Sequence, residues 1–308
     1  MSVIFGPIVS RRLGYSLGVD VVPSEKKTCT LDCLYCQAGR TVKQTTQRRD
    51  YLPTARILKE IDTVLPMKDI HFITFSGCGE PTLHKSLGKI IERIKSRTRT
   101  PVAVITNGTL MDRPDVRQDL MRANLVVPSL DAVTPEIFAA INRPHKSLRI
   151  DNIIKGLAQF RREYKGEMWV EVLLVKGVND NVDELMRINE ALEAINPHRI
   201  HLNTITRPPA DASAQALEAS ELQRIAGIFG SKATVIGVAP PKDKRRTAFN
   251  LEEGVIELVK RRGITVNDLV EGLGMHRDVA TDVLDKLVQA NKIKKVSHGD
   301  VTFYREYY

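Results

Sequence analysis

Residues 27–36 read Lys27-Thr-Cys29-Thr-Leu-Asp-Cys33-Leu-Tyr-Cys36 and contain three of the four cysteines of the chain. Cysteine thiolates are soft ligands that select zinc, copper(I) or iron–sulfur clusters. Three thiolates are too few for a closed structural zinc site, which normally takes four ligands. On a four-iron cluster, three cysteines leave one iron open to a substrate or cofactor. The segment therefore favours a catalytic iron–sulfur cluster, with a zinc knuckle completed by a distant ligand as the alternative.

Short apolar runs alternate with longer amphipathic stretches around this segment. The runs are rich in Val, Ile, Leu or Phe and bounded by turn residues, so we predict strands at Leu17–Val22, Ile70–Ser76, Val102–Thr106, Leu125–Leu130, Trp169–Val175 and Arg199–Asn203. The stretches between them predict helices at Thr54–Val64, Leu87–Ser96, Pro114–Ala123, Asp151–Tyr164 and Val182–Ile195. This alternation is typical of parallel βαβ units with right-handed crossovers. Six such strands predict an α/β fold with a partial (βα)6 barrel.

Polar and glycine-containing segments follow these strands directly. They are Gly77-Cys78-Gly79-Glu80, Thr106-Asn107-Gly108, Ser129-Leu130-Asp131, Lys176-Gly177 and Asn203. In parallel barrels the active-site groups lie at the carboxyl ends of the strands, and the cysteine segment also follows a strand. We therefore expect all of them to share one site. Asn107 and Asp131 are equally suited to capping the helices that follow them.

The CX3CX2C spacing, with Tyr35 immediately before the last cysteine, resembles the radical S-adenosylmethionine (SAM) superfamily. The resemblance implies that Cys29, Cys33 and Cys36 hold a [4Fe–4S] cluster whose open iron is chelated by the methionyl part of SAM. It also implies an enzyme: one electron from the cluster cleaves SAM, and a 5′-deoxyadenosyl radical abstracts hydrogen from a substrate. Such a reaction implies a reductant such as flavodoxin or ferredoxin as a partner.

Gly77-Cys78-Gly79-Glu80-Pro81 is similar to the second motif of that family, Gly-Gly-Glu-Pro, apart from its cysteine. Glycines allow close approach of a ligand to the backbone, and the resemblance implies that Glu80 binds the amino group of SAM. Residues implied to contact SAM are Tyr35, Gly77, Gly79, Glu80, Asn107, Ser129, Asp131, Lys176 and Asn203. No residue is assigned a catalytic role. Cys78 is interpreted as a small strand-end residue, with a fourth cluster ligand and a hydrogen donor as alternatives.

Two further segments, 5–19 and 142–145, resemble a poorly characterised subgroup of iron–sulfur oxidoreductases related to the tRNA wyosine-forming enzyme. That resemblance implies an RNA base as a possible substrate, although a second cysteine triad is absent from the sequence. Guanidinium groups suit phosphate and carboxylate. As a group, Arg11, Arg12, Arg40 and Arg143 are candidates to gather around an anionic substrate, whereas for any single one a solvated surface position is the better interpretation.

The hydrophobic pattern changes after Val238. Residues 240–248 are basic and contain proline, which is typical of a linker. Helices are then predicted at Asn250–Arg261, after the N-cap Thr265, and at Asp278–Ala290, followed by a hairpin turning at 297–300. Three helices and a β-hairpin predict a winged helix-turn-helix over 249–308, after a barrel domain at 1–239.

The third helix of a winged helix usually enters the major groove of nucleic acid. Here it carries Asp278, Asp282 and Asp285, which would repel phosphate. The lysines near the predicted hairpin suit contacts to RNA better, and docking of a peptide or protein is the alternative.

The formal net charge of +9 favours a polyanionic partner such as nucleic acid. No apolar run approaches the roughly 20 residues that span a bilayer, and the N-terminus lacks the pattern of a signal peptide. We therefore expect a cytoplasmic protein without a membrane partner. The main hypothesis is a radical SAM enzyme acting on RNA. The alternatives are a radical SAM enzyme for a peptide, protein or small molecule, and a transcription factor with an iron–sulfur sensor, in which Glu80 would have no purpose.

Overall fold

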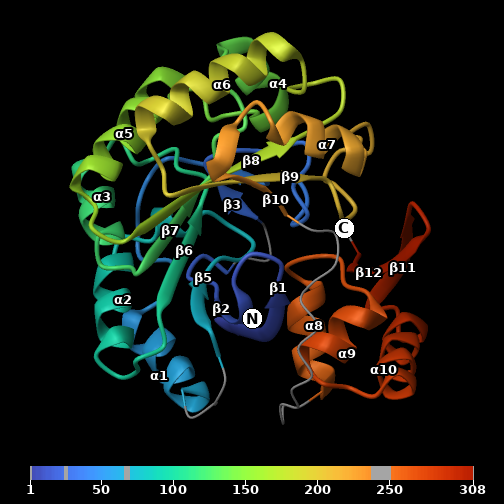
Figure 1. The fold of residues 1–308 in the computed structure, drawn as a ribbon. Helices are drawn as coiled ribbons and strands as arrows, with labels where there is room; N and C mark the ends of the chain where they lie inside the picture. Colours follow the sequence, from blue (N-terminus) through green and yellow to red (C-terminus); the bar gives the residue numbers. More distant parts are fainter. Residues whose placement is uncertain (1, 24–26, 66–69, 237–250, 308) are drawn as a thin grey trace.

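The computed structural model describes residues 2–23, 27–65, 70–236 and 251–307. An open sheet of eight strands curves through the barrel part of the chain in the order β1-β2-β5-β6-β7-β8-β9-β10 (Figure 1). Its strands are β1 (Ile4–Ser10), β2 (Gly14–Val19), β5 (Phe72–Phe75), β6 (Val102–Thr106), β7 (Leu125–Pro128), β8 (Glu167–Leu174), β9 (Arg199–Thr204) and β10 (Ala233–Val235). Only β1 is antiparallel to its neighbour in this sheet. The predicted α/β fold with a mostly parallel sheet is confirmed.

Helices cover the outer face of this sheet (Figure 1). They are α1 (Thr54–Val64), α2 (Leu87–Lys95), α3 (Pro114–Leu120), α4 (Pro135–Asn142), α5 (Ile150–Glu163), α6 (Val182–Ile195) and α7 (Ala219–Ala226). Each buries one apolar stripe: in α5 the buried residues Ile150, Ile153, Leu157 and Phe160 recur at the spacing of one helix face. The strands between them are buried on both sides, which explains their nearly continuous apolar runs.

Among the strands and helices named above, four were not predicted: β1, β10, α4 and α7. The segment that forms β1 contains Gly6-Pro7, which argues against a strand, and its pairing with β2 is irregular between Phe5 and Ile8. The first predicted strand, Leu17–Val22, lies instead at Gly14–Val19, because pairing with β1 already begins at Gly14. The observed boundaries of this strand thus differ from the predicted ones because of its hairpin pairing with β1.

The amino-terminal end of the sheet interior is filled by side chains. Leu13, from the turn between β1 and β2, packs there with Ala103, Leu125 and Val127, beside Trp169. A cavity inside the sheet therefore lies toward the carboxyl ends of the strands, as expected for an active site in a parallel barrel.

The C-terminal unit, residues 251–307, contains the three helices and the hairpin that the sequence predicts. They are α8 (Leu251–Val259), α9 (Val266–Gly272), α10 (Arg277–Gln289), β11 (Ile293–His298) and β12 (Val301–Glu306). Thr265 is the N-cap of α9, as predicted: its side chain accepts from the Asp268 amide, and Asp268 bonds back to the Thr265 amide. The predicted linker, 240–248, lies outside the described residues, so the domain boundaries stay predictions.

The C-terminal unit packs against the first two strands (Figure 1). Phe5 of β1 belongs to the apolar core of this unit, and the Tyr15 hydroxyl of β2 donates to the carbonyl of Gly272 at 3.0 Å. A buried ion pair joins Arg261, after α8, to Asp20, after β2, and both side chains are 3% exposed. Across the described residues, no helix is both long and apolar enough to cross a membrane.

Candidate active site

A cavity of about 660 Å³ lies inside the sheet and extends to the C-terminal unit. On the barrel side its walls are the cysteine segment and residues of β5, β6, β8 and β9. On the other side they are residues near α8, α9 and β12. The predicted site residues that line it are Cys29, Cys33, Tyr35, Cys36, Gly77, Gly79, Glu80, Asn107, Ser129 and Asn203. Residues from distant parts of the sequence thus meet in one cavity.

The cysteine sulfurs have amide and ammonium groups beside them. Asn107 Nδ2 lies 3.5 Å from Cys29 Sγ, and Asn142 Nδ2 lies 3.3 Å from Cys33 Sγ. Burial raises the pKa of the Cys29 thiol to about 11. The buried ammonium of Lys27 acts in the opposite direction and lowers the pKa of the Cys29 thiol. Burial lowers the pKa of Lys27 itself, but the sulfurs of Cys36 and Cys29 raise it above its ordinary value. A buried cation and two amide donors lower the cost of holding thiolates at this place.

The arrangement of the three cysteines fits an iron–sulfur cluster. No three His, Cys, Asp or Glu side chains converge closely enough, among the residues described, to hold a single metal ion. In a four-iron cluster each cysteine binds a different iron, so the ligands surround the cluster instead of meeting at one point. N–H donors to the sulfurs are also the interactions that tune such clusters. The three cysteines and the N–H donors beside them therefore fit such a cluster.

Cys78 lies on the cavity wall, but its polar contacts are to the protein. Its sulfur is 3.5 Å from the carbonyl of Lys260, and its amide donates to Asp20 Oδ2 at 3.1 Å. Burial raises the pKa of its thiol, and Asp20 adds to that effect. These contacts favour the interpretation of Cys78 as a buried strand-end residue over that of a fourth ligand.

Glu80 is buried at the end of β5, and its carboxylate is held by four donors. Oε1 accepts from Thr106 Oγ1 at 2.5 Å, from Thr82 Oγ1 at 2.7 Å and from the Thr82 amide at 3.0 Å. Among the residues that the structure describes, Oε2 accepts from the Asn107 amide alone, at 2.8 Å. Burial raises the pKa of Glu80, and these donors oppose that rise. Since a carboxylate oxygen can accept two bonds, Oε2 keeps one acceptor position for a ligand.

The glycines of the Glu80 segment make room for the protein itself. A Cβ atom on Gly77 would lie 2.2 Å from the carboxyl carbon of Asp20, and one on Gly79 would lie 2.4 Å from the carbonyl oxygen of Thr28. The expectation that these glycines serve the approach of a ligand is therefore incomplete. They are needed first so that the strand end can pack against Asp20 and the cysteine segment.

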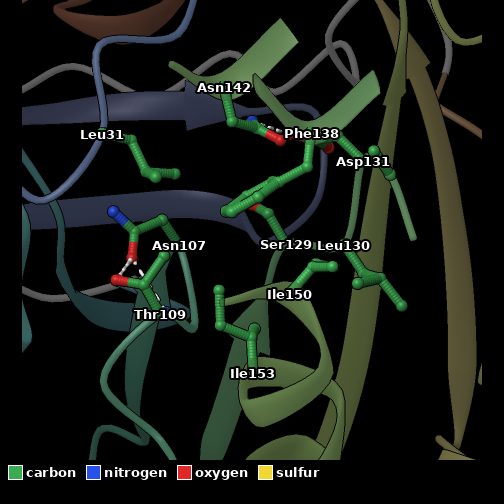
Figure 2. Close-up of a pocket in the computed structure, with 11 residues that line it drawn as sticks. Leu31, Asn107, Thr109, Ser129, Leu130, Asp131, Phe138, Asn142, Ile150 and Ile153 are labelled. Carbon is green, nitrogen blue, oxygen red and sulfur yellow. Dashed lines mark hydrogen bonds between the residues drawn. The ribbon is translucent and has the colours of Figure 1, made fainter. Parts of the chain in front are cut away.

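Asp131 lies behind the cysteine segment. Its carboxylate accepts from the Tyr35 hydroxyl at 2.5 Å, from Asn142 Nδ2 at 2.8 Å and from the Leu173 amide at 2.9 Å. Burial raises its pKa to about 6. It lines a recess of about 10 Å³ beside Ser129 and Asn107, shown in Figure 2, which has room for about one water molecule. The geometry therefore gives Asp131 a role in holding Tyr35 and Asn142.

Besides Asp131, three residues expected at the site do not line this cavity. The half-exposed ammonium of Lys176 lies 3.9 Å from Glu221 on the outside of the barrel. Arg40 pairs with Asp32 at 2.7 Å, and Arg143 pairs with Asp211 at 2.6 Å. The expected gathering of four arginines is thus wrong for Arg40 and Arg143, because each has a local carboxylate partner.

Arg11 and Arg12 do reach the cavity. From the turn between β1 and β2 they cross the interior of the sheet, where Arg12 pairs with Glu171 of β8 and Arg11 Nη1 lies 3.4 Å from Asn203 Oδ1 of β9. Sequence reasoning missed Glu171, although a charged residue inside the apolar run of β8 is a detectable signal. It also missed Arg207 and Arg262, for which the sequence offers no comparable pattern.

The chain is similar in sequence to known proteins and to one family model. The family model described as the radical SAM superfamily matches residues 27–188. The chain is 38% identical over 305 residues to a protein of Brachyspira hyodysenteriae named GTPase Obg, covering 98% of this chain but only 45% of that protein. It is 32% identical over 312 residues to UPF0026 protein MJ1312 of Methanocaldococcus jannaschii, covering 99% of this chain and 96% of that protein.

A solved structure shares the fold. The structure of TYW1 with a lysine–pyruvate adduct bound aligns with a TM-score of 0.55 at 19% identity, over 73% of this chain and 75% of that chain. At that identity the likeness concerns the fold alone. The family match, over more than half of the chain, shows that the chain belongs to the radical SAM superfamily.

Proposed function

We propose that this enzyme binds a [4Fe–4S] cluster through Cys29, Cys33 and Cys36 and binds SAM beside it. When bound, these groups supply reductive cleavage of SAM to a 5′-deoxyadenosyl radical, which abstracts hydrogen from the substrate. The observation that carries the proposal is that the three cysteines and Glu80 line one cavity. An electron donor such as flavodoxin or ferredoxin, in the cytoplasm, completes the proposed reaction.

The side chains of the site divide the work of binding and positioning. Glu80 Oε2 is the acceptor for the ammonium group of SAM, since Oε1 is already occupied by Thr82 and Thr106. Asn107, Ser129 and Asn203 offer polar atoms around the rest of SAM. Asp131 orients Tyr35. The apolar side chains at the amino-terminal end of the sheet interior, around Leu13, exclude water from that side of the cavity. Lys176 is left out, because it lies away from the cavity.

We further propose that the C-terminal unit is a winged helix and that the substrate is an RNA base. The net charge of +9 and the resemblance of segments 5–19 and 142–145 support RNA. One lysine of the wing, Lys295, pairs with Asp285 at 2.9 Å, which reduces the positive charge of the wing. Base recognition is therefore assigned to the cavity, with the wing making at most weak phosphate contacts.

A peptide, protein or small-molecule substrate is the alternative. It is favoured by α10, whose exposed face carries Asp278 and an Asp282–Lys286 pair instead of a row of unpaired cations. Such a face suits docking of a polypeptide better than docking of a duplex. In that case the winged helix would serve as the docking module.

Anaerobic reconstitution with iron and sulfide tests the proposed chemistry. After reduction in the presence of SAM, we expect 5′-deoxyadenosine and methionine in the reaction, detected by mass spectrometry. A cluster that forms without ever cleaving SAM would contradict the enzymatic proposal and favour a sensor.

Binding of bulk tRNA tests the substrate class. Phosphate contacts are strongest at low ionic strength, so a tRNA-binding enzyme should retain labelled tRNA at low salt and release it as salt rises. No retention even at low salt would remove RNA and leave the alternative substrates.

A further inference from the structure

Five arginines line the cavity where the barrel meets the C-terminal unit. One of them, Arg261, is held in the buried ion pair with Asp20, and the other four form a separate group. Arg11 and Arg12 come from the turn between β1 and β2, Arg207 follows β9, and Arg262 follows α8. They therefore belong to three separate parts of the chain, two in the barrel and one in the C-terminal unit. We call Arg11, Arg12, Arg207 and Arg262 the arginine cluster.

Only two members of the arginine cluster are fully paired. Arg12 forms an ion pair with Glu171, and Arg207 binds Asp268 with both terminal nitrogens, at 2.7 and 3.0 Å. Arg262 shares the same Asp268 at 3.3 Å, and its buried Nε has no hydrogen-bond partner among the residues described. Arg11 has Asn203 as its hydrogen-bond partner, at 3.4 Å, and no carboxylate within ion-pair distance in the described part of the chain.

The cluster carries positive charge in excess of its carboxylates. Apart from Glu80 beside the cysteines, the carboxylates on the cavity wall are Glu171, Asp268 and Glu271, three against the four guanidinium groups of the cluster. Burial, together with the repulsion between these guanidinium groups, lowers the pKa of both incompletely paired members, Arg11 and Arg262. Burial and then Arg12 lower the pKa of Arg11 to about 10, and burial and then Arg207 lower that of Arg262 to about 10. An anion between them would remove an unfavourable interaction as well as supply acceptors.

We propose that Arg11 and Arg262 bind a phosphate group of the substrate, a subsite built jointly by the barrel and the C-terminal unit. This inference rests on the proposed function, since it places the substrate in the same cavity as the cysteines. The reacting part of the substrate would then lie toward Glu80 and its phosphate toward the C-terminal unit.

Phosphate fits this place better than a carboxylate does. A carboxylate has two coplanar oxygens that one guanidinium can satisfy, as Asp268 does for Arg207. Arg11 and Arg262 approach from different segments, so their donors suit an anion with oxygens on several sides. Asp268 also fixes Arg207 and Arg262, which limits the rotamer entropy lost on binding.

Calorimetric titration of the full chain with inorganic phosphate tests the subsite, before and after cluster reconstitution. Arg11→Ala and Arg262→Ala should each weaken phosphate binding about tenfold or more, the effect of losing a charge-assisted hydrogen bond. Arg11→Lys should restore part of the affinity, which separates charge from misfolding. The matched control is Arg99→Ala, which removes the same charge from an exposed turn, and it should bind as the wild type does.

Two further titrants distinguish the sources of the phosphate. A nucleoside 5′-monophosphate represents a small substrate, and a short single-stranded RNA without terminal phosphate represents a phosphodiester; tighter binding of one identifies the source. Equal phosphate binding by wild type and both alanine variants would overturn the proposal. Displacement of phosphate by SAM would also overturn it, since the arginines would then belong to the SAM site. Failure of SAM cleavage, with phosphate binding intact, would instead contradict the proposed function alone.

Discussion

At the scale of single residues, the four cysteines have different surroundings. Asn107 and Asn142 donate to the sulfurs of Cys29 and Cys33, whereas Cys78 contacts the carbonyl of Lys260. We expect Cys29→Ala, Cys33→Ala and Cys36→Ala each to abolish the reconstituted cluster, measured as iron and sulfide per chain and by electron paramagnetic resonance after reduction. Cys78→Ala should keep the iron content of the wild type. Loss of iron in Cys78→Ala would make Cys78 a ligand and contradict this interpretation.

Glu80 gives a second prediction at this scale. Glu80→Gln keeps the shape but replaces a carboxylate oxygen that faces the cavity, and an amide binds an ammonium group far more weakly. We expect the dissociation constant of SAM to rise about tenfold or more in the reconstituted protein, in line with roughly 1.5–3 kcal/mol for a hydrogen bond to a charged group. Equilibrium binding of labelled SAM measures this. Glu92→Gln, on the exposed face of α2, is the control; unchanged SAM affinity in Glu80→Gln would remove Glu80 from the SAM site.

Residue types and spacing predicted the cysteine triad and the Glu80 segment, because both are local in sequence. They did not predict the position of Lys176, since a lysine just after a strand can point out of the barrel as readily as into it. Only the pairing of Lys176 with Glu221 decides the matter, and Glu221 belongs to α7, which the sequence did not predict.

At the scale of elements, the start of α9 combines a cap with ion pairs. Asp268 closes the capping box with Thr265 and pairs with Arg207 and Arg262. Burial opposes its ionisation, but Arg262 and Arg207 hold the pKa of Asp268 well below its usual range. A carboxyl with a depressed folded pKa stabilises the protein above its unfolded pKa, about 3.9, and that contribution is lost as the pH falls.

We therefore expect Asp268→Asn to lower the free energy of unfolding near neutral pH by about 3 kcal/mol, because it leaves two guanidinium groups without their carboxylate. The difference from wild type should shrink from about pH 5 downward, where the wild type begins to lose the same interaction. Denaturant unfolding at several pH values measures both. Asp300→Asn, in the exposed hairpin turn, is the control, and an equal loss in that variant would contradict the assignment.

Periodicity predicted the three C-terminal helices and the hairpin with a correct cap at Thr265, because caps and turns are short-range signals. The same signals failed for β1, whose Gly6-Pro7 segment is held in the sheet by pairing to β2 and by contact of Phe5 with the C-terminal unit. Tertiary contacts there override local preference.

At the scale of the whole molecule, the ion pair of Asp20 and Arg261 joins the barrel to the C-terminal unit. Both side chains are buried, so Arg261→Gln would leave the Asp20 carboxylate without its charged partner. We expect the variant to lose about 3–5 kcal/mol of stability, and we expect both parts to unfold in one transition in the wild type. Calorimetry with hydrogen exchange measures this. Independent melting of the C-terminal unit in the wild type would contradict tight coupling.

The sequence predicted the barrel and the C-terminal unit separately, but it did not predict the contact between them. Asp20 and Arg261 are separated by 241 residues, and neither belongs to a motif that names the other. The arginine cluster was half predicted for the same reason. Arg11 and Arg12 stand in a recognisable segment, whereas Arg207 follows β9 outside any motif and Arg262 reaches the cavity only through the docking of the C-terminal unit.

The contacts of Asp20 limit which substitutions can be tolerated during evolution. Its carboxylate occupies the space that a side chain at Gly77 would need, accepts the Cys78 amide and receives Arg261. Positions 20, 77 and 261 therefore constrain one another, and a change at one is tolerated only with compensation at the others. A chimera that exchanges the C-terminal unit between distant homologues would need to carry the matching residues at positions 20 and 77 with it.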